Sequence, residues 1–162
     1  MEQNVSMKIN ELPSPTWNWL KVNETSIKWS TKIEPCEIAA EGDEVATETE
    51  QLLDIETGAG READAIFATE NTAKYQILAD NAGQDKTVRL HISGKKDAHT
   101  AGCVEIVAKE NSTLTVVMDS RVAPDATKEE ESTAEASLAV RVRMKVESGA
   151  SVRLVQVQMP QE

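Results

Sequence analysis

The chain has 162 residues, a net charge of −11 and only five aromatic residues, the last of which is Tyr75. This length predicts a single domain, and the shortage of aromatics predicts a core of thin, regularly stacked aliphatic layers. Twelve acidic residues against one arginine in residues 33–70 account for the whole net charge. The balance disfavours nucleic-acid binding, because phosphates require clusters of Lys and Arg.

The sequence gives no sign of a membrane segment or of a disulfide framework. No stretch approaches the roughly 18 apolar residues of a membrane span, and the opening MEQNVSMKIN lacks the build of a signal peptide. The two cysteines, Cys36 and Cys103, are too few for a disulfide framework and suit a reducing compartment. We therefore expect a cytoplasmic protein that does not bind membranes.

Residues 1–50 are expected to form an N-terminal extension with an acidic connection. Two prolines in NELPSPTWNWLKVNET force an extended entry, and TWNWLKVN is expected to form a short helix or strand. That segment would lay Trp17 and Leu20 over an exposed end of the core. Residues 34–50 are expected to be loosely ordered or to serve as an edge connection.

From residue 51 onward the sequence changes to short runs in which apolar and polar residues alternate, typical of strands. Gly, Asn, Asp and Ser separate these runs, and none of them shows a helical period. The predicted strands are QLLDIET (51–57), DAIFAT (64–69), AKYQILA (73–79), KTVRLHI (86–92), CVEIVAK (103–109), STLTVVMD (112–119), SLAVRVRMKV (137–146) and ASVRLVQVQM (150–159).

Three of these segments repeat one strand-turn-strand pattern. ATENTAKYQIL, AKENSTLTVVM and VESGASVRLVQ begin at residues 68, 108 and 146, so they align at offsets of 40 and 38. A regular period of this size indicates stacked repeats that cover one another's apolar side. For residues 51–162 we predict an all-β fold of the β-helix type, with a β-sandwich as the alternative. A propeller is disfavoured because the later repeats lack aromatics.

One segment breaks the repetition. Residues 121–137, RVAPDATKEEESTAEAS, are charged and poor in large apolar side chains. We expect them to form a protruding, mobile loop.

Enzymatic motifs are missing from the sequence. It has no Gly-rich phosphate loop, CxxC pair, HExxH or Gly-x-Ser-x-Gly elbow, so we assign no catalytic, cofactor-binding or metal-binding residue and expect no enzyme. Alternation in VRLHI places His91 opposite the apolar face formed by Val88, Leu90 and Ile92.

Two other functions stay open. His99 and Cys103 are four residues apart and are potential metal ligands, although Cys36 and His91 are remote from them in sequence. The first alternative is therefore a small metal-binding or cluster-binding protein that uses these Cys and His residues. The second is a β-helical carbohydrate-active enzyme, which is supported only by the predicted architecture and by the many carboxylates.

Several of these segments, taken in order, resemble the SufB/SufD family. ELPSPTWNWLKVN is similar to the Leu-Pro-x-x-Thr-Trp entry segment of some SufD-like proteins, and KTVRLHI…CVEIVAKENSTLTVVMDS…VRMKVESGASVRLVQVQ resembles the first half of the family core. The resemblance covers residues 10–25 and 73–158. It implies a right-handed parallel β-helix and a scaffold role in iron-sulfur cluster assembly, together with a SufB-like subunit and a SufC-type ATPase.

The chain also departs from that family. Family members normally have several hundred residues, and the later segments that carry their Cys and His positions have no counterpart here, so no site residue is transferred. We therefore expect a fragment or a shortened relative. Its exposed final rung, around Val152 to Val157, is expected to mediate self-association.

Overall fold

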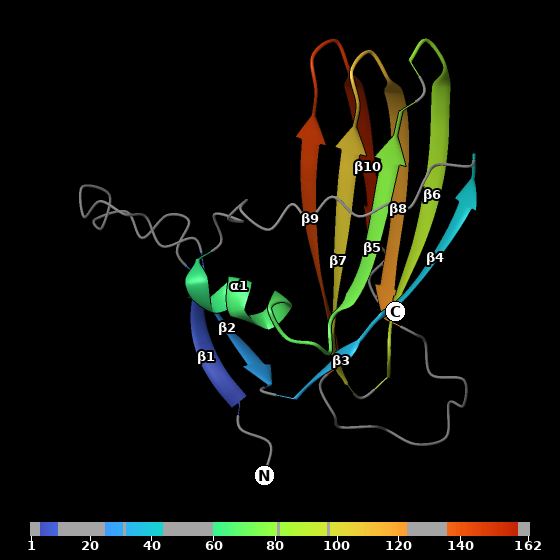
Figure 1. Ribbon diagram of the computed structural model, residues 1–162. Coiled ribbons are helices and arrows are strands. Elements are labelled where there is room, and N and C mark those ends of the chain that lie inside the picture. The colour runs from blue at the N-terminus through green and yellow to red at the C-terminus, as the bar shows by residue number, and fades with distance from the viewer. Residues whose placement is uncertain are drawn as a thin grey trace.

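The computed structural model describes residues 4–9, 25–30, 32–43, 60–80, 82–96, 98–122 and 136–158. Within these ranges the protein is all-β apart from one short helix (Figure 1). None of the helical structure described there is long and apolar enough to cross a membrane. The segments TWNWLKVN and QLLDIET and most of the predicted loop at 121–137 lie outside the described residues.

Two four-stranded sheets form the body of the protein. The β7 sheet contains β3 (Ile33–Pro35), β5 (Ala73–Ala79), β7 (His99–Ala108) and β9 (Ser137–Val146). The β8 sheet contains β4 (Glu37–Gly42), β6 (Asp85–Gly94), β8 (Thr113–Val122) and β10 (Ser151–Gln158). Outside them, β1 (Asn4–Ile9) and β2 (Thr25–Ser30) form an antiparallel pair.

From β5 onward the chain alternates between the two sheets. The pairs β5–β7, β7–β9, β6–β8 and β8–β10 are all parallel, whereas the edge strand β4 runs antiparallel to β6. Each consecutive pair of strands (β5 and β6, β7 and β8, β9 and β10) therefore forms one layer, called a rung below. The three rungs stack side by side, as Figure 1 shows.

The strand register corrects one of the two predicted offsets. The second and third rungs align at an offset of 38, with His99 opposite Ser137 and Thr113 opposite Ser151, as predicted. The first and second rungs do not align at 40, because β5 and β7 are offset by 29 (Ala73 opposite Gly102) and β6 and β8 by 28. The counterpart of AKENSTLTVVM is the segment starting at Ala79, and not ATENTAKYQIL.

Six of the predicted strands are confirmed as β5 to β10, with boundaries shifted by at most a few residues. The strand predicted at 64–69 is wrong, because α1 (Arg61–Phe67) covers most of it. Its sequence READAIF combines good helix formers with Ala63 and Ile66 three residues apart, and both are buried. The strands β1 and β2 were not predicted.

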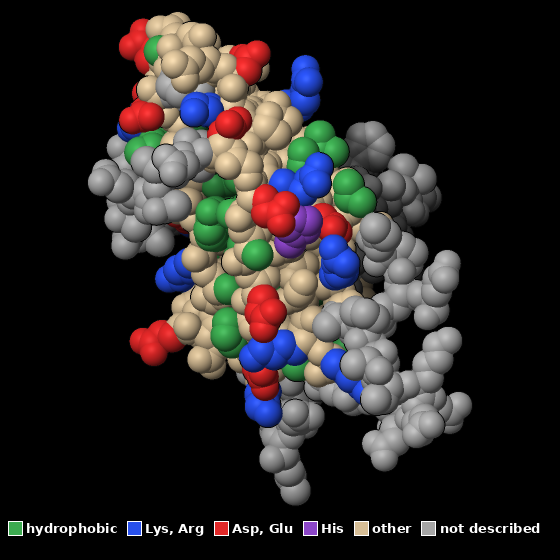
Figure 2. Space-filling view, turned by 90° about the vertical axis from the view of Figure 1, so that its right-hand side faces the viewer, with side chains coloured by type: hydrophobic (Ala, Val, Ile, Leu, Met, Phe, Trp, Pro, Cys, Tyr) green, Lys and Arg blue, Asp and Glu red, His purple; other side chains and the backbone are tan. Residues whose placement is uncertain are grey.

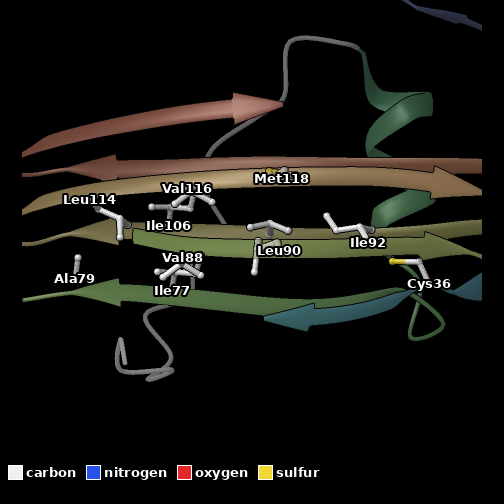
Figure 3. Packing of buried hydrophobic residues seen from close by; sticks show 11 residues of the cluster. Cys36, Ile77, Ala79, Val88, Leu90, Ile92, Ile106, Leu114, Val116 and Met118 are labelled. Atoms are coloured by element: carbon white, nitrogen blue, oxygen red, sulfur yellow. The ribbon is translucent and has the colours of Figure 1, made fainter. Parts of the chain in front are cut away.

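The main core fills the space between the two sheets. Alternate residues of each strand point inward, and Val88, Leu90 and Ile92 are buried there as predicted. Val116 and Met118 of β8 continue the same layers (Figure 3). A smaller cluster on the outer side of the β7 sheet contains Trp29, Ile33, Ile66 and Ala101.

The stack has two different ends. At the β5–β6 end, residues 33–42 cross from an edge of the β7 sheet to an edge of the β8 sheet, and Cys36 and Ile38 pack on the core there. We call this the closed end. It includes much of the acidic stretch that was expected to be loosely ordered or an edge connection, and β4 is indeed an edge strand.

Candidate functional site

The opposite end of the stack is formed by β9 and β10, which we call the open rung. Within the described residues, each of these strands pairs on one side only, β9 with β7 and β10 with β8. The amide of Ser151 donates to the Ser112 carbonyl at 2.9 Å, toward β8. Because N–H groups alternate in direction along a strand, those of Val152, Leu154 and Gln156 point to the outer edge.

Exposed apolar side chains are concentrated on this rung. Met144 and Val146 of β9 are 43% and 49% exposed, and Val155 and Val157 of β10 are 40% and 39% exposed. They are the large hydrophobic side chains that stand out as exposed among the described residues. Free strand edges that carry such side chains are typical places for another chain to bind.

A cleft of about 270 Å³ opens between the sheets beside the open rung. Its apolar wall contains Met118, Val122, Leu138 and Val140. Three further lining residues are polar and take inward-facing positions along their strands: Ser120, Gln156 and Gln158. In the same layer β6 has the fully buried Ile92, opposite Ser120, so the core loses apolar volume toward the open rung and leaves this cleft.

The open rung is basic, although the chain as a whole is acidic. β9 and β10 contain four basic residues and no acidic one. Nη1 of Arg141 lies 3.6 Å from Oδ1 of Asp64, and the guanidinium group of Arg141 stacks over the Phe67 ring. Nη1 of Arg143 lies 3.7 Å from Oε1 of Glu105. The other two, Lys145 and Arg153, are exposed at the rung surface, and Nζ of Lys145 lies 3.7 Å from Oε1 of Glu147.

Cys103 has two arginines beside it that the sequence did not reveal. Register pairs Cys103 with Arg141 of β9, and the charges of Arg141 and Arg143 both act on the thiol. Burial raises the pKa of the Cys103 thiol, and the charges of both arginines oppose that rise. The sequence showed no adjacent base because these side chains come from a strand 38 residues away.

Cys36 lies on the other face of the β7 sheet, in the main core. A Cβ at position 102 would collide with its Sγ atom, so glycine is required at this close approach. Burial raises the pKa of the Cys36 thiol to about 11, which keeps it protonated and unreactive at neutral pH. Both cysteines are free thiols.

His91 is half-buried between two carboxylates on the outer side of the β8 sheet. Its Nε2 lies 3.6 Å from Oε2 of Glu41, and its Nδ1 lies 3.5 Å from Oδ2 of Asp119. Arg121 binds the same oxygen of Asp119 at 2.7 Å. Figure 2 looks onto a face where acidic side chains flank a histidine, with basic side chains close by. The two carboxylates contact opposite ring nitrogens, so they do not converge on a single point.

His99 lies apart from the other candidate ligands. Its ring is 5.3 Å from that of Trp29, and Nδ1 shares a 2.6 Å hydrogen bond with Oγ of Ser137. The structure thus places Cys36, Cys103, His91 and His99 in different surroundings. Among the described residues, no group of three or more Cys, His, Asp or Glu side chains is arranged to hold a metal ion.

Comparison with known proteins found no matching family model, no matching curated protein and no matching solved structure.

Proposed function

We propose that this protein is a binding scaffold that acts by associating with another protein through its open rung. The observation that carries the proposal is the end of the stack, where, among the described strands, both sheets finish on a strand paired on one side only, with four exposed apolar side chains. Exposed strand edges recruit partner strands through main-chain hydrogen bonds.

The proposal includes a specific architecture, a short right-handed parallel β-helix of three rungs. Its support is the alternation of the chain between two sheets whose β5 to β10 pairings are all parallel. The immunoglobulin-type sandwich consists of antiparallel sheets, so the pairing favours the β-helix. The right-handed sense follows the strong preference of parallel crossover connections.

The resemblance to SufB/SufD proteins gives the scaffold proposal its particular form. In this form the chain is a SufD-like cytoplasmic component of iron-sulfur cluster assembly, and its partners are a SufB-like subunit and a SufC-type ATPase. It carries out no chemistry of its own. The metal-binding alternative has less support, because the structure separates the four Cys and His side chains on which it depends.

The test is reconstitution with purified partners. We expect the wild-type chain to co-elute with a SufB-like subunit and a SufC-type ATPase in size-exclusion chromatography, with a light-scattering mass equal to that of the complex. The double variant Val155→Asp/Val157→Asp changes only exposed side chains, so it should fold and yet fail to co-elute. Absence of a wild-type complex at tens of micromolar, a range typical of weak specific binding, would reject the SufD-like role.

A further inference from the structure

The closed end shows how this fold seals a rung. Residues 33–42 lie extended along the stack, and β4 pairs antiparallel with β6. Cys36 and Ile38 face the core, whereas Glu37 and Glu41 are exposed. The seal is thus an extended segment with apolar side chains inward and carboxylates outward.

The open rung has the features that such a segment needs. The outward N–H groups of Leu154 and Gln156 provide donors for an added strand. The cleft beside Leu138 and Val140 offers about 270 Å³ for an inward apolar side chain. The carboxamide of Gln156 lines the same cleft and can bond to a peptide group of that strand.

Charge determines which kind of segment fits. Arg141, Arg143 and Lys145 have carboxylates within this chain, whereas Arg153 is exposed on β10 itself, and neither strand has an acid. A second copy joined rung to rung would bring like charges together, which opposes the self-association expected from the sequence. An acidic segment is attracted instead.

We propose that the open rung binds an extended, acidic, amphipathic segment of a partner protein, which adds to β10 as an antiparallel strand. The partner segment has the chemistry of residues 33–42 of this chain, with carboxylates outward and an aliphatic side chain in the cleft. This inference rests on the proposed scaffold function and names the chemistry of the segment that the rung selects.

Two fluorescein-labelled peptides test the proposal on the full chain. The acidic probe is IEPAEIAAEG, the sequence of residues 33–42 with alanine for Cys36, and the control is IKPAKIAAKG. We expect a saturable rise in fluorescence anisotropy with the acidic probe, and binding at least about tenfold weaker with the lysine control, in line with the loss of several charge pairs.

Three variants locate the binding. Arg153→Glu should weaken the acidic probe about fivefold or more, whereas Lys28→Glu, the same charge change on β2, should alter binding by less than about twofold. Gln156→Pro removes an outward N–H from an edge strand, which tolerates proline there, and should abolish binding. Circular dichroism of each variant checks that the sheets are intact.

Several outcomes would overturn the inference. The inference fails if both peptides bind equally well or if Arg153→Glu has no effect on binding. It also fails if the wild-type chain dimerises through the open rung and excludes the probe. If neither peptide binds but the complex with the SufB-like subunit still forms and is lost in Val155→Asp/Val157→Asp, this inference fails and the scaffold function stands. If neither the peptides nor the SufB-like subunit binds, both this inference and the proposed scaffold function are rejected.

Discussion

At the scale of single residues, the buried thiol of Cys36 shows how closely the crossing segment between β3 and β4 packs on β7. Its sulfur occupies the space where any side chain at Gly102 would lie, and it belongs to the core cluster with Ile77 and Leu90. Free cysteine acts here as a small apolar side chain. The core therefore accommodates a neutral thiol much better than a thiolate.

Because of this preference, the free energy of unfolding should fall as the pH becomes alkaline. In the folded protein the pKa of Cys36 is about 11, above the ordinary value of 9.0. The contribution of the neutral thiol to the free energy of unfolding is therefore fully present below pH 9 and is lost as pH rises through 11. We expect Cys36 to account for about 2 kcal/mol of lost unfolding free energy by pH 11. Urea denaturation of reduced wild type and Cys36→Ala at pH 8 and pH 11 measures it.

Comparison with Cys36→Ala cancels the titration of lysines and tyrosine, which both proteins share. The variant should be less stable than wild type at pH 8 because it loses buried volume, and the gap should narrow at pH 11. An unchanged gap between the two pH values would contradict a buried neutral thiol.

At the scale of elements, stacked turns align the rungs. The Asn111 amide donates to the Ser148 carbonyl at 3.1 Å, and the Gly83 amide donates to the Asn111 carbonyl at 3.3 Å, so the turns of all three rungs lie in one column. Asn111 and Gly149 both have positive φ, at 60° and 68°. A Cβ at Gly149 would collide with Oδ1 of Asn111.

The turn column gives a matched pair of substitutions. Gly83 also has positive φ, at 78°, but nothing lies within 4 Å of its missing Cβ. Gly83→Ala should lower the free energy of unfolding by about 1 kcal/mol, from backbone strain alone. Gly149→Ala should lower it by about 2 to 3 kcal/mol, because Asn111 must also move. Thermal or urea unfolding measures both, and equal costs would show that the turns do not support one another.

The strands were predictable because their alternation reflects local burial. AKYQILA and SLAVRVRMKV match β5 and β9 residue for residue, because apolar residues alternate along each strand; Ile77 and Ala79 of β5 are buried, whereas the apolar face of β9 is only half-buried. The READAIF segment was misassigned because a seven-residue helix shows only two buried positions, too few for a period to stand out. The offset of 40 predicted between the first two repeats was wrong because the rungs differ in length. Paired positions of β5 and β7 are 29 residues apart, whereas those of β7 and β9 are 38 apart, and only the pairing of strands in space reveals this difference.

The same limit applies to the candidate site. Exposure of Val155 and Val157 on the last rung followed from the order of strands along the chain, so it was predictable. The cleft and the contact of Cys103 with Arg141 depend on side chains from different strands, and no spacing in the sequence reports them. The basic character of β9 and β10 was readable, but the overall charge of −11 concealed it.

At the scale of the whole molecule, stability should fall from the middle of the stack to the open rung. β7 and β8 have neighbours on both sides, whereas β9 and β10 have one each among the described strands. Stacked repeats derive much of their stability from contacts between neighbouring rungs.

Amide hydrogen exchange reports this gradient. We expect the amides of β7 and β8 to exchange at least about tenfold more slowly than those of β9 and β10, since local opening needs fewer contacts to break at the edge. Binding of the acidic probe should slow exchange at Leu154 and Gln156 in particular. Uniform exchange rates across the four strands would show that the molecule opens only as one unit.

The reversed direction of β4 has a consequence for how large an assembly this protein can join. In the β8 sheet the run of parallel pairs ends at β6, because β4 runs antiparallel to it, so a further layer on that side would not continue the parallel ladder. If partners add at the open rung, as proposed, each molecule should end a row instead of linking two. Such a subunit favours complexes of fixed, small stoichiometry and prevents runaway fibres.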